Sequence, residues 1–326
     1  MEVHQVDPAD PDGCARWARL YSSAIANDAP WHGVMHPQRV SWMASRPGHP
    51  PRLQIFRDNG QDVAISQLTT GQWDNRDLAL GELMVHPDVR RQGHGSAALG
   101  VLEEQARELN CTRMVLDGPD VEATREFSAA TGYQVDLVGL ARRVRLDQVD
   151  WSALASQVQR ATEASADYEL LRQSGPTPQE YLPGLVEVFN SMRDAPTGEM
   201  PLEEDVYSIE RLSETERHYS GPENRFWQLI ARHRESGELV GHTVVVVNAL
   251  DPECAEQHET SVKRQHRGHQ LGIRLKAEML QWLQQVEPQL RTITTWNAEP
   301  NKHMGQVNDA LGFEVMSRWL DVAKSL

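Results

Sequence analysis

The sequence contains one layout twice, and this repetition limits the chain to folds built from two similar domains. The segments Val85–Gly95 and Val262–Gly272 both read as a strand end, a short basic loop and a helix start, and they lie 177 residues apart. Three further landmarks recur in the same order at steps of 177, 180 and 166 residues: Asp58-Asn-Gly60 with Glu235-Ser-Gly237, Gly132-Tyr133 with Gly312-Phe313, and Asp28-Ala-Pro30 with Asp194-Ala-Pro196. Four matches in one order indicate a duplicated domain.

The chain length agrees with a duplication. A chain of 326 residues is long for one domain and comfortable for two of about 150 residues each. We therefore expect a first domain at 1–150, a linking helix at 151–165 and a second domain at 166–326. Each unit is large enough to bury a core of its own.

Composition indicates which classes of partner and which cell compartment to expect. The net charge of −15 opposes binding to phosphate backbones, so DNA and tRNA are poor partners, whereas a cationic amine suits such a surface. The sequence has no apolar run long enough for a bilayer and no basic, apolar leader at its start, so we expect a cytoplasmic protein without a membrane partner. Cys14, Cys111 and Cys254 are scattered without metal-ligand spacing, and we expect no metal.

The order of predicted elements is similar in the two units. In the first we expect helices at 13–26, 96–109 and 122–130, and strands at 52–57, 63–68, 78–85, 113–116 and 137–146. In the second we expect helices at 178–192, 202–219, 271–286 and 301–311, and strands at 168–171, 226–232, 239–248, 292–296 and 319–322. Hairpins followed by alternating strands and helices predict a mixed α/β fold, with helices on both faces of each sheet.

The basic loop is suited to a phosphate group. In the first copy, Arg90-Arg-Gln-Gly-His-Gly95 joins a strand end to a helix start, where backbone N–H groups have no helical partner and the helix dipole favours an anion. Glycine lets the main chain approach the phosphate closely, and Arg90 and Arg91 add charged donors. A dinucleotide fingerprint would instead follow the first strand directly. Recurrence with flanking arginines favours a phosphate site over a simple tight turn.

At this point the sequence resembles the GNAT superfamily of acyltransferases, as a tandem two-domain protein. The loop Arg90–Gly95 matches the superfamily pattern Arg/Gln-x-x-Gly-x-Gly/Ala for the pyrophosphate of coenzyme A. The second copy, Arg267-Gly-His-Gln-Leu-Gly272, departs from the pattern at Gln270, where the first glycine is usual. The segment from Asn297 to Phe313 is similar to the family's last motif. The resemblance therefore implies two GNAT-type domains, each with a mixed, mostly antiparallel sheet flanked by helices.

The resemblance also implies the chemistry. It implies acetyl-CoA, or another acyl-CoA, as co-substrate and direct attack by the amine of a small molecule, without a covalent enzyme intermediate. Backbone groups of the strand before each loop, near Met84 and Val85 and near Ser261 and Val262, would pair with the pantetheine arm, and a backbone N–H would polarise the thioester carbonyl. Many members protonate the leaving thiolate with a tyrosine four residues before the last glycine. This chain has Ser128 and Asn308 there.

The expected cofactor contacts lie in the two loops, in the strand ends before them and in the last motif. They are Met84, Val85, Arg90, Arg91, Gln92, Gly93, His94, Gly95 and Ser96 in the first unit, and Val262, Arg267, Gly268, His269, Gln270, Leu271, Gly272, Asn297 and Asn301 in the second. The better loop lies in the first unit and the better last motif in the second. We therefore expect slightly better cofactor binding in the first unit, and the sequence leaves the catalytic unit open.

A base is needed for the acceptor. An alkylamine with a pKa near 10.4 is neutral in only about one molecule in a few thousand at pH 7, which corresponds to roughly 4–5 kcal/mol. Glu82 and Glu259 each lie three residues before the end of their strand, and Glu256 lies six before it. Regular alternation puts Glu256 and Glu259 on opposite faces unless a bulge intervenes. We favour Glu82 and Glu259 because the duplication repeats them.

Two alternatives remain open at this stage. The same fold could take its acyl group from an acyl carrier protein or, less well suited to an acidic chain, from an aminoacyl-tRNA. The missing tyrosines also allow an acyl-CoA-binding protein that performs no catalysis.

Overall fold

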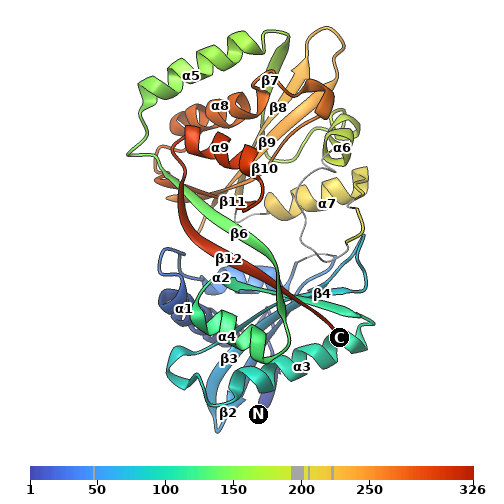
Figure 1. Ribbon diagram of the computed structural model, residues 1–326, viewed down its shortest axis with the longest axis vertical. Coiled ribbons are helices and arrows are strands. Elements are labelled where there is room, and N and C mark those ends of the chain that lie inside the picture. Colours follow the sequence, from blue (N-terminus) through green and yellow to red (C-terminus); the bar gives the residue numbers. More distant parts are fainter. Residues whose placement is uncertain (47, 192–201, 205, 222–223) are drawn as a thin grey trace. The chain divides into compact units, whose positions relative to one another are not determined.

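A computed structural model describes the chain except for residues 47, 192–201, 205 and 222–223 (Figure 1). The chain forms two compact units. The first comprises 1–139, 197–203 and 317–326, and the second comprises 140–196 and 204–316. The repeated landmark at Asp194-Ala-Pro196 lies outside the described residues.

The first unit has a mixed sheet. Its strands are β1 (Glu2–Gln5), β2 (Arg52–Asp58), β3 (Gln61–Thr70), β4 (Leu78–Val85), β5 (Arg113–Pro119) and the end of β12 (Glu314–Ser325), in the order β1-β2-β3-β4-β5-β12. The pairs β1–β2, β2–β3, β3–β4 and β5–β12 are antiparallel, and β4–β5 is parallel. The parallel pair flanks α3 in sequence, as a βαβ crossover requires.

Helices pack on both faces of this sheet. They are α1 (Pro11–Asp28), α2 (Pro37–Ala44), α3 (His94–Glu108) and α4 (Glu122–Ala130), with a short 3-10 turn, η1 (Pro87–Val89), before α3. Ile65 packs in one cluster with Trp17 of α1, whereas the adjacent Ala64 packs with Ala98 of α3. Successive strand residues point to opposite faces, so α1 and α3 cover opposite sides.

The second unit repeats this arrangement. Its strands are the second half of β6 (Gln134–Arg145), β7 (Tyr168–Ser174), β8 (Asn224–His233), β9 (Leu239–Asn248), β10 (Cys254–Val262) and β11 (Thr292–Ala298), in the order β6-β11-β10-β9-β8-β7. The pair β10–β11 is parallel, and β7–β8, β8–β9 and β9–β10 are antiparallel. Its helices are α5 (Trp151–Ala164), α6 (Leu182–Asn190), α7 (Ile209–Tyr219), α8 (Leu271–Val286) and α9 (Lys302–Ala310), with η2 (Arg264–His266) before α8.

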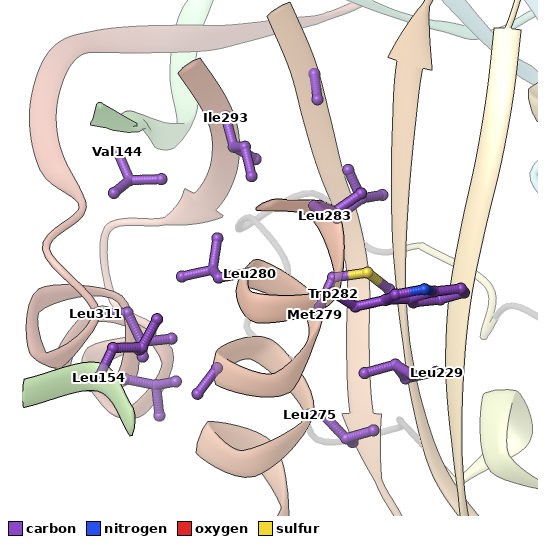
Figure 2. Close-up of a cluster of buried hydrophobic side chains, with 14 of the residues drawn as sticks. Val144, Leu154, Leu229, Leu275, Met279, Leu280, Trp282, Leu283, Ile293 and Leu311 are labelled. Atoms are coloured by element: carbon purple, nitrogen blue, oxygen red, sulfur yellow. The ribbon is translucent and has the colours of Figure 1, made fainter. Parts of the chain in front are cut away.

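The largest core cluster lies under α8. Leu275, Met279 and Leu283 of this helix pack with Leu229 of β8 and Ile293 of β11 (Figure 2). All five side chains are fully buried. The apolar positions 275, 279 and 283 recur every four residues, which places them on one face of the helix. This packing fixes the start of α8, where the second basic loop ends.

The end of the chain completes the sheet of the first unit. Trp319–Ser325 pair antiparallel with Arg113–Pro119 of β5. Leu320 is fully buried in the cluster that also contains Leu99 and Met114. The compact units therefore do not coincide with continuous ranges such as 1–150 and 166–326, because 317–326 belongs to the first unit and the second begins at Leu140.

The mixed α/β prediction is confirmed, with corrections to individual elements. The helix expected at 202–219 begins only at Ile209, because Ser208 caps it by accepting a hydrogen bond from the Arg211 N–H at 3.1 Å. The last strand is longer than the expected 319–322. Among the described residues no helix is long and apolar enough to cross a membrane.

Candidate functional site

In both units the two parallel strands separate about halfway along the first of them. Pairing between β4 and β5 runs from Leu78 with Arg113 to Gly81 with Leu116. Pairing between β10 and β11 likewise ends at Gln257 with Thr295. The backbone of the last strand residues is then available, on that side, to an extended ligand that adds as a strand.

The two loops have the same backbone course. Residues 91 and 268 are equivalent, as are 93 and 270, and all four have positive φ: 64° for Arg91, 88° for Gly268, 88° for Gly93 and 56° for Gln270. Each loop therefore has one glycine and one larger residue in the left-handed region. The departure from the family pattern at Gln270 leaves the path of the second loop unchanged, and α8 begins directly after it.

In the second unit the loop borders a cavity of about 700 Å³. Ser261 and Val262 of β10, Arg267 and Gly272 of the loop and helix start, and Asn301 at the start of α9 are among its lining residues. Several other predicted contacts, Gly268, Gln270 and Leu271, also line it. Strand end, helix N-terminus and last motif thus meet at one hollow, as a long ligand with a charged end requires.

The corresponding place beside Gly95 in the first unit is more crowded. A Cβ placed on Gly95 would lie 3.1 Å from the ring of Phe127 in α4 and 3.4 Å from Val85. A Cβ placed on Gly272 would have no atom of the described residues within 4 Å, apart from its chain neighbours and its own helix backbone. The residue equivalent to Phe127, at the 180-residue step, is Val307, which lines the cavity. A smaller side chain on α9 therefore leaves room that Phe127 occupies on α4.

The first-unit arginines are held by carboxylates. Arg90 donates to Asp28 at 2.9 and 2.6 Å and to the Val85 carbonyl at 3.2 Å. Burial raises the pKa of Asp28, but hydrogen bonds from Arg90 and Asn27 outweigh it and hold this pKa below its usual value. Arg91 pairs with Glu126 at 2.8 Å and is largely exposed.

The second loop uses one of these contacts again. Arg267 donates to the Val262 carbonyl at 3.0 Å, the counterpart of the bond from Arg90 to Val85. In both units this bond ties the loop back to the strand end. The remaining predicted loop contacts Gln92, Ser96 and His269 are exposed, and His94 and Met84 are partly buried.

The asparagines of the last motif are engaged within the second unit. Asn301 caps α9 by accepting a bond from the Met304 N–H at 3.2 Å. The Asn297 side chain accepts from Asn308 at 3.3 Å and donates to the Ala298 carbonyl at 3.2 Å. Asn308, where many relatives carry tyrosine, is fully buried. In the first unit Ser128 donates to the Thr124 carbonyl of its own helix at 2.7 Å.

Glu82 belongs to an acidic group in the first unit. Burial raises the pKa of Glu82 to about 8, with a further contribution from the charge of Asp117, while Arg39 opposes the rise. Burial also raises the pKa of Asp117 to about 6. Asp117 lies directly opposite Asp321 on β12 and accepts a bond from Trp319 Nε1 at 3.0 Å. Carboxyl groups this enclosed hold protons at pH values where exposed ones do not.

In the second unit a β-bulge changes the orientation of the glutamates. The register of β10 against β9 shifts between Gln257 and Thr260, so two β10 residues face the single residue Val244. Glu256 pairs with Val246, two positions further along β9, and Val244 and Val246 belong to one cluster. The bulge therefore turns Glu259 toward the face that Glu256 also uses. Glu256 is exposed and lies 3.7 Å from His258, and Glu259 is partly buried.

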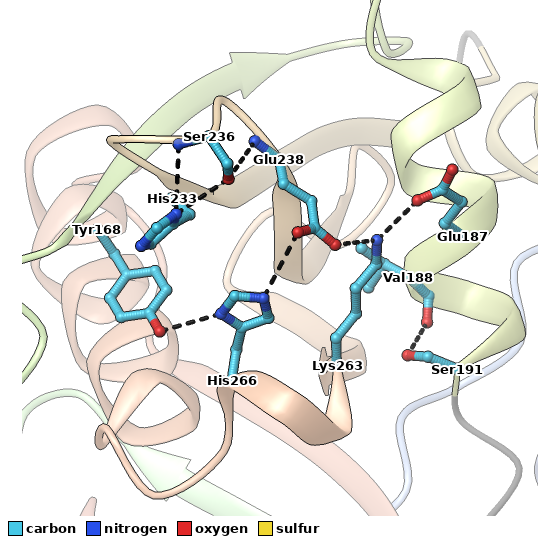
Figure 3. Close-up of polar contacts among 9 residues, drawn as sticks. All are labelled: Tyr168, Glu187, Val188, Ser191, His233, Ser236, Glu238, Lys263 and His266. Atoms are coloured by element: carbon cyan, nitrogen blue, oxygen red, sulfur yellow. Dashed lines mark hydrogen bonds and ion pairs between the residues drawn. The ribbon is translucent and has the colours of Figure 1, made fainter.

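A polar network supports the second loop, and the sequence analysis did not identify it. Lys263 Nζ contacts Glu187 and Glu238 at 2.8 Å each, and the Tyr168 hydroxyl lies 3.0 Å from His266 Nδ1 (Figure 3). His266 Nε2 lies 3.6 Å from Glu238. Bonds from Lys263 lower the pKa of Glu238 against the effect of burial. Tyr168, Glu187 and Glu238 lie far from the loop in the sequence, so the only signal was that Lys263 and His266 are next to it.

Known proteins share the features of this fold. The model of the acetyltransferase (GNAT) family matches residues 17–133 and 187–313, which together make up most of the chain. No curated protein matches the sequence. In the described residues no group of three or more His, Cys, Asp or Glu side chains could hold a metal ion.

Two solved structures match along nearly the full chain. A tandem GNAT protein from the clavulanic acid biosynthesis pathway, solved without acetyl-CoA, is 26% identical with a TM-score of 0.82, covering 99% of this chain and 98% of that one. A GCN5-related N-acetyltransferase from Sphaerobacter thermophilus is 16% identical with a TM-score of 0.69, covering 99% and 95%. The second likeness concerns the fold alone.

Proposed function

The chain belongs to the acetyltransferase (GNAT) family, and on this premise we propose that it transfers an acetyl group from acetyl-CoA to the amine of a small molecule. We further propose that the second unit binds the donor. The observation that carries the proposal is the meeting of the β10 end, the loop and α9 at one cavity of about 700 Å³. The first unit, which the loop sequence favours, has Phe127 in the corresponding place.

The residues of the second unit fit coenzyme A. Backbone N–H groups at the start of α8 and Arg267 would hold the diphosphate, since a helix N-terminus favours an anion. The free edge of Ser261 and Val262 would pair with the amides of the pantetheine arm. Met304 and Val307 supply an apolar wall on α9. When bound, the donor supplies a thioester, whose carbonyl carbon accepts a nucleophile.

The protein's part in the reaction is to orient the amine and remove its proton. In our proposal Glu259 receives the first proton of the ammonium, directly or through water. As the C–N bond forms and the C–S bond breaks, CoA leaves as the thiolate, and the second proton of the nitrogen passes to that thiolate through solvent. In support, Glu259 lies two residues beyond Gln257, where the pairing of β10 with β11 ends. A backbone N–H of β10 would stabilise the carbonyl oxygen as negative charge develops. Glu82 would have this role only above the high pKa that burial gives it.

Calorimetric titration with acetyl-CoA tests donor binding. Gly272→Phe places a ring into the open space of the cavity, and we expect its Kd to rise at least about tenfold, or roughly 1.4 kcal/mol. Gly100→Phe is the matched control, because Gly100 lies on the exposed surface of α3 and also meets open space. An unchanged Kd for Gly272→Phe would contradict donor binding in the second unit.

Release of free CoA in the presence of an amine panel tests catalysis. We expect turnover by the wild type, and for Glu259→Gln a kcat lower by about 10²–10⁴ with unchanged acetyl-CoA affinity, the range typical of a removed general base. The same measurement with Glu82→Gln serves as a control, with kcat unchanged. Tight acetyl-CoA binding without turnover on any amine would instead indicate a binding protein.

A further inference from the structure

We propose that His242 and Ser261, two buried polar side chains that are opposite each other on neighbouring strands, position an acceptor carrying a hydroxyl group next to its reacting amine. This inference rests on the proposed function, and it names the class of acceptor for the same site. Ser261 would contact the acceptor. His242 would act through Ser261 as a positioning residue.

The two residues face each other across neighbouring strands. His242 lies on β9 and Ser261 on β10, and they are direct partners in the antiparallel register. Directly opposed residues of an antiparallel pair have their side chains on the same face. Ser261 also lines the cavity of the second unit, and its strand is the one that we propose to pair with the donor. The pair therefore lies next to the reacting end of the site.

Both side chains are buried. His242 is 0% and Ser261 3% exposed. Among the described residues, neither imidazole nitrogen of His242 has a hydrogen-bond partner, and the Ser261 hydroxyl has none. The ring of Phe189 lies against His242, with centroids 4.5 Å apart. Buried polar groups are nearly always bonded, so orphaned ones need an explanation beyond folding.

The duplicated unit shows that the fold does not require this pair. At the 177-residue step, His242 corresponds to Ile65 and Ser261 to Met84, and these two are also direct partners in their register. Ile65 is buried in an apolar cluster, and Met84 packs against the same cluster. The same strand pairing is thus stable with two apolar side chains. At this pair of positions the second unit has three buried nitrogen or oxygen atoms without a hydrogen-bond partner among the described residues, whereas Ile65 and Met84 have no side-chain nitrogen or oxygen.

The chemistry of the pair favours a neutral polar group. Burial lowers the pKa of His242 to about 4, so at neutral pH its ring has one donor and one acceptor nitrogen. A hydroxyl on the acceptor can both donate to and accept from such a pair. A carboxylate would lack a cation, because Lys263 is already bonded to Glu187 and Glu238. The geometry therefore points to amino alcohols, including amino sugars, and away from amino acids.

The test compares two amines of equal size, ethanolamine and propylamine, which differ by a hydroxyl in place of a methyl group. For the wild type we expect kcat/KM for ethanolamine to exceed that for propylamine by about ten- to a hundredfold, because a site with unpaired polar groups rejects the analogue that lacks a partner. Ser261→Ala should lower this preference to within about threefold, mainly through KM. Ser261→Thr retains the hydroxyl and should restore it.

The double variant His242→Ile with Ser261→Met provides the control for folding. It copies the apolar pair of the first unit, so we expect it to fold with an unchanged or higher Tm. We also expect it to lose the preference for ethanolamine over propylamine. Acetyl-CoA affinity of His242→Phe and Ser261→Ala should equal that of the wild type. A structural role alone would lower Tm and leave the ratio of the two substrates unchanged.

The outcomes separate the two proposals. Equal use of ethanolamine and propylamine by an active wild type, or a preference that persists in Ser261→Ala, overturns the acceptor assignment and leaves the transferase proposal intact. A wild type that turns over none of the amines overturns the proposed function and this inference with it. Loss of the preference in both Ser261→Ala and the double variant, with donor affinity unchanged, supports the assignment.

Discussion

The ring of Phe127 lies against Gly95 at the start of α3, so that a Cβ on Gly95 would come within 3.1 Å of it. At the same point of the second unit, Gly272 opens onto the cavity that Val307 lines. The duplicated helix start thus lies against an aromatic ring in one unit and against open space in the other. The loop residues themselves do not distinguish these cases, since both loops follow the same left-handed turns.

Removing the Phe127 ring should give the first unit a donor site. We expect Phe127→Ala to raise the stoichiometry of acetyl-CoA binding from about one toward two, because the space beside Gly95 becomes available. Loss of a partly buried ring should also cost stability, by less than the about 3–5 kcal/mol of a fully buried phenylalanine. Calorimetry gives the stoichiometry, and Glu122→Ala at the exposed start of α4 is the control. A wild type that already binds two equivalents would contradict this expectation.

Because of Glu82, stability of the first unit should fall as the pH rises from about 5 to 8. The folded pKa is raised to about 8 from an ordinary value of 4.5, so the buried carboxyl is neutral at low pH and folding opposes its ionisation as the pH rises between these values. Glu82→Gln mimics the neutral form. The free energy of unfolding in urea of Glu82→Gln should exceed that of the wild type by an amount that grows from pH 5 to 8 and then levels off. We expect a final difference of a few kcal/mol, because each pKa unit corresponds to about 1.4 kcal/mol. A pH-independent difference would disprove the shift.

Lys276 should destabilise the second unit at neutral pH. It is buried on α8 over the ring of Phe313 at 5.0 Å, and burial, with a contribution from Arg142, lowers its pKa from 10.5 to about 7. The folding penalty is therefore complete below pH 7 and disappears as the pH rises to 10.5. Lys276→Leu, which copies the equivalent Leu99, should increase the free energy of unfolding by a few kcal/mol at pH 6–7. Denaturant titrations at pH 6.5 and 10 would show whether the pH-dependent gain is present.

A change near the end of the chain should destabilise the first unit. Leu320 of β12 is fully buried in its core and pairs with Gly118 of β5. Leu320→Ala should cost about 2–5 kcal/mol, and amide exchange should accelerate first in β4 and β5. Ser325→Ala, exposed on the same strand, should have no effect. Faster exchange confined to α8 and β9 would refute the assignment of this strand to the first unit.

Much of the architecture could be predicted from the sequence, because it depends on local patterns. The duplicated loop led to the family, to a tandem arrangement and to an N-acetyltransferase, and these predictions are confirmed. Helices such as α4 and α5 and the strand β9 begin and end at the expected residues. Apolar periodicity and turn sequences fix such elements within a few residues of chain. The roles of Glu82, Glu259 and the loop residues stay predictions.

The parts that the sequence left open depend on distant residues. Regular alternation would put Glu256 and Glu259 on opposite faces unless a bulge intervened, and β10 has such a bulge. Continuous domain ranges did not anticipate that 317–326 completes the first sheet. A strand carries no local mark of the partner that it will pair with, since any edge of suitable pattern can accept it.

The sequence by itself determined the duplicated fold and the course of both loops, because turn residues and hydrophobic periodicity act over short stretches. Only the tertiary structure decided which unit keeps a cavity, which carboxyl groups are buried together and which polar atoms are left without partners. Those properties arise from side chains such as Phe127 and Val307, or His242 and Ser261, that meet only after the chain has folded. Burial and pKa depend on that packing, and no short segment of sequence contains it.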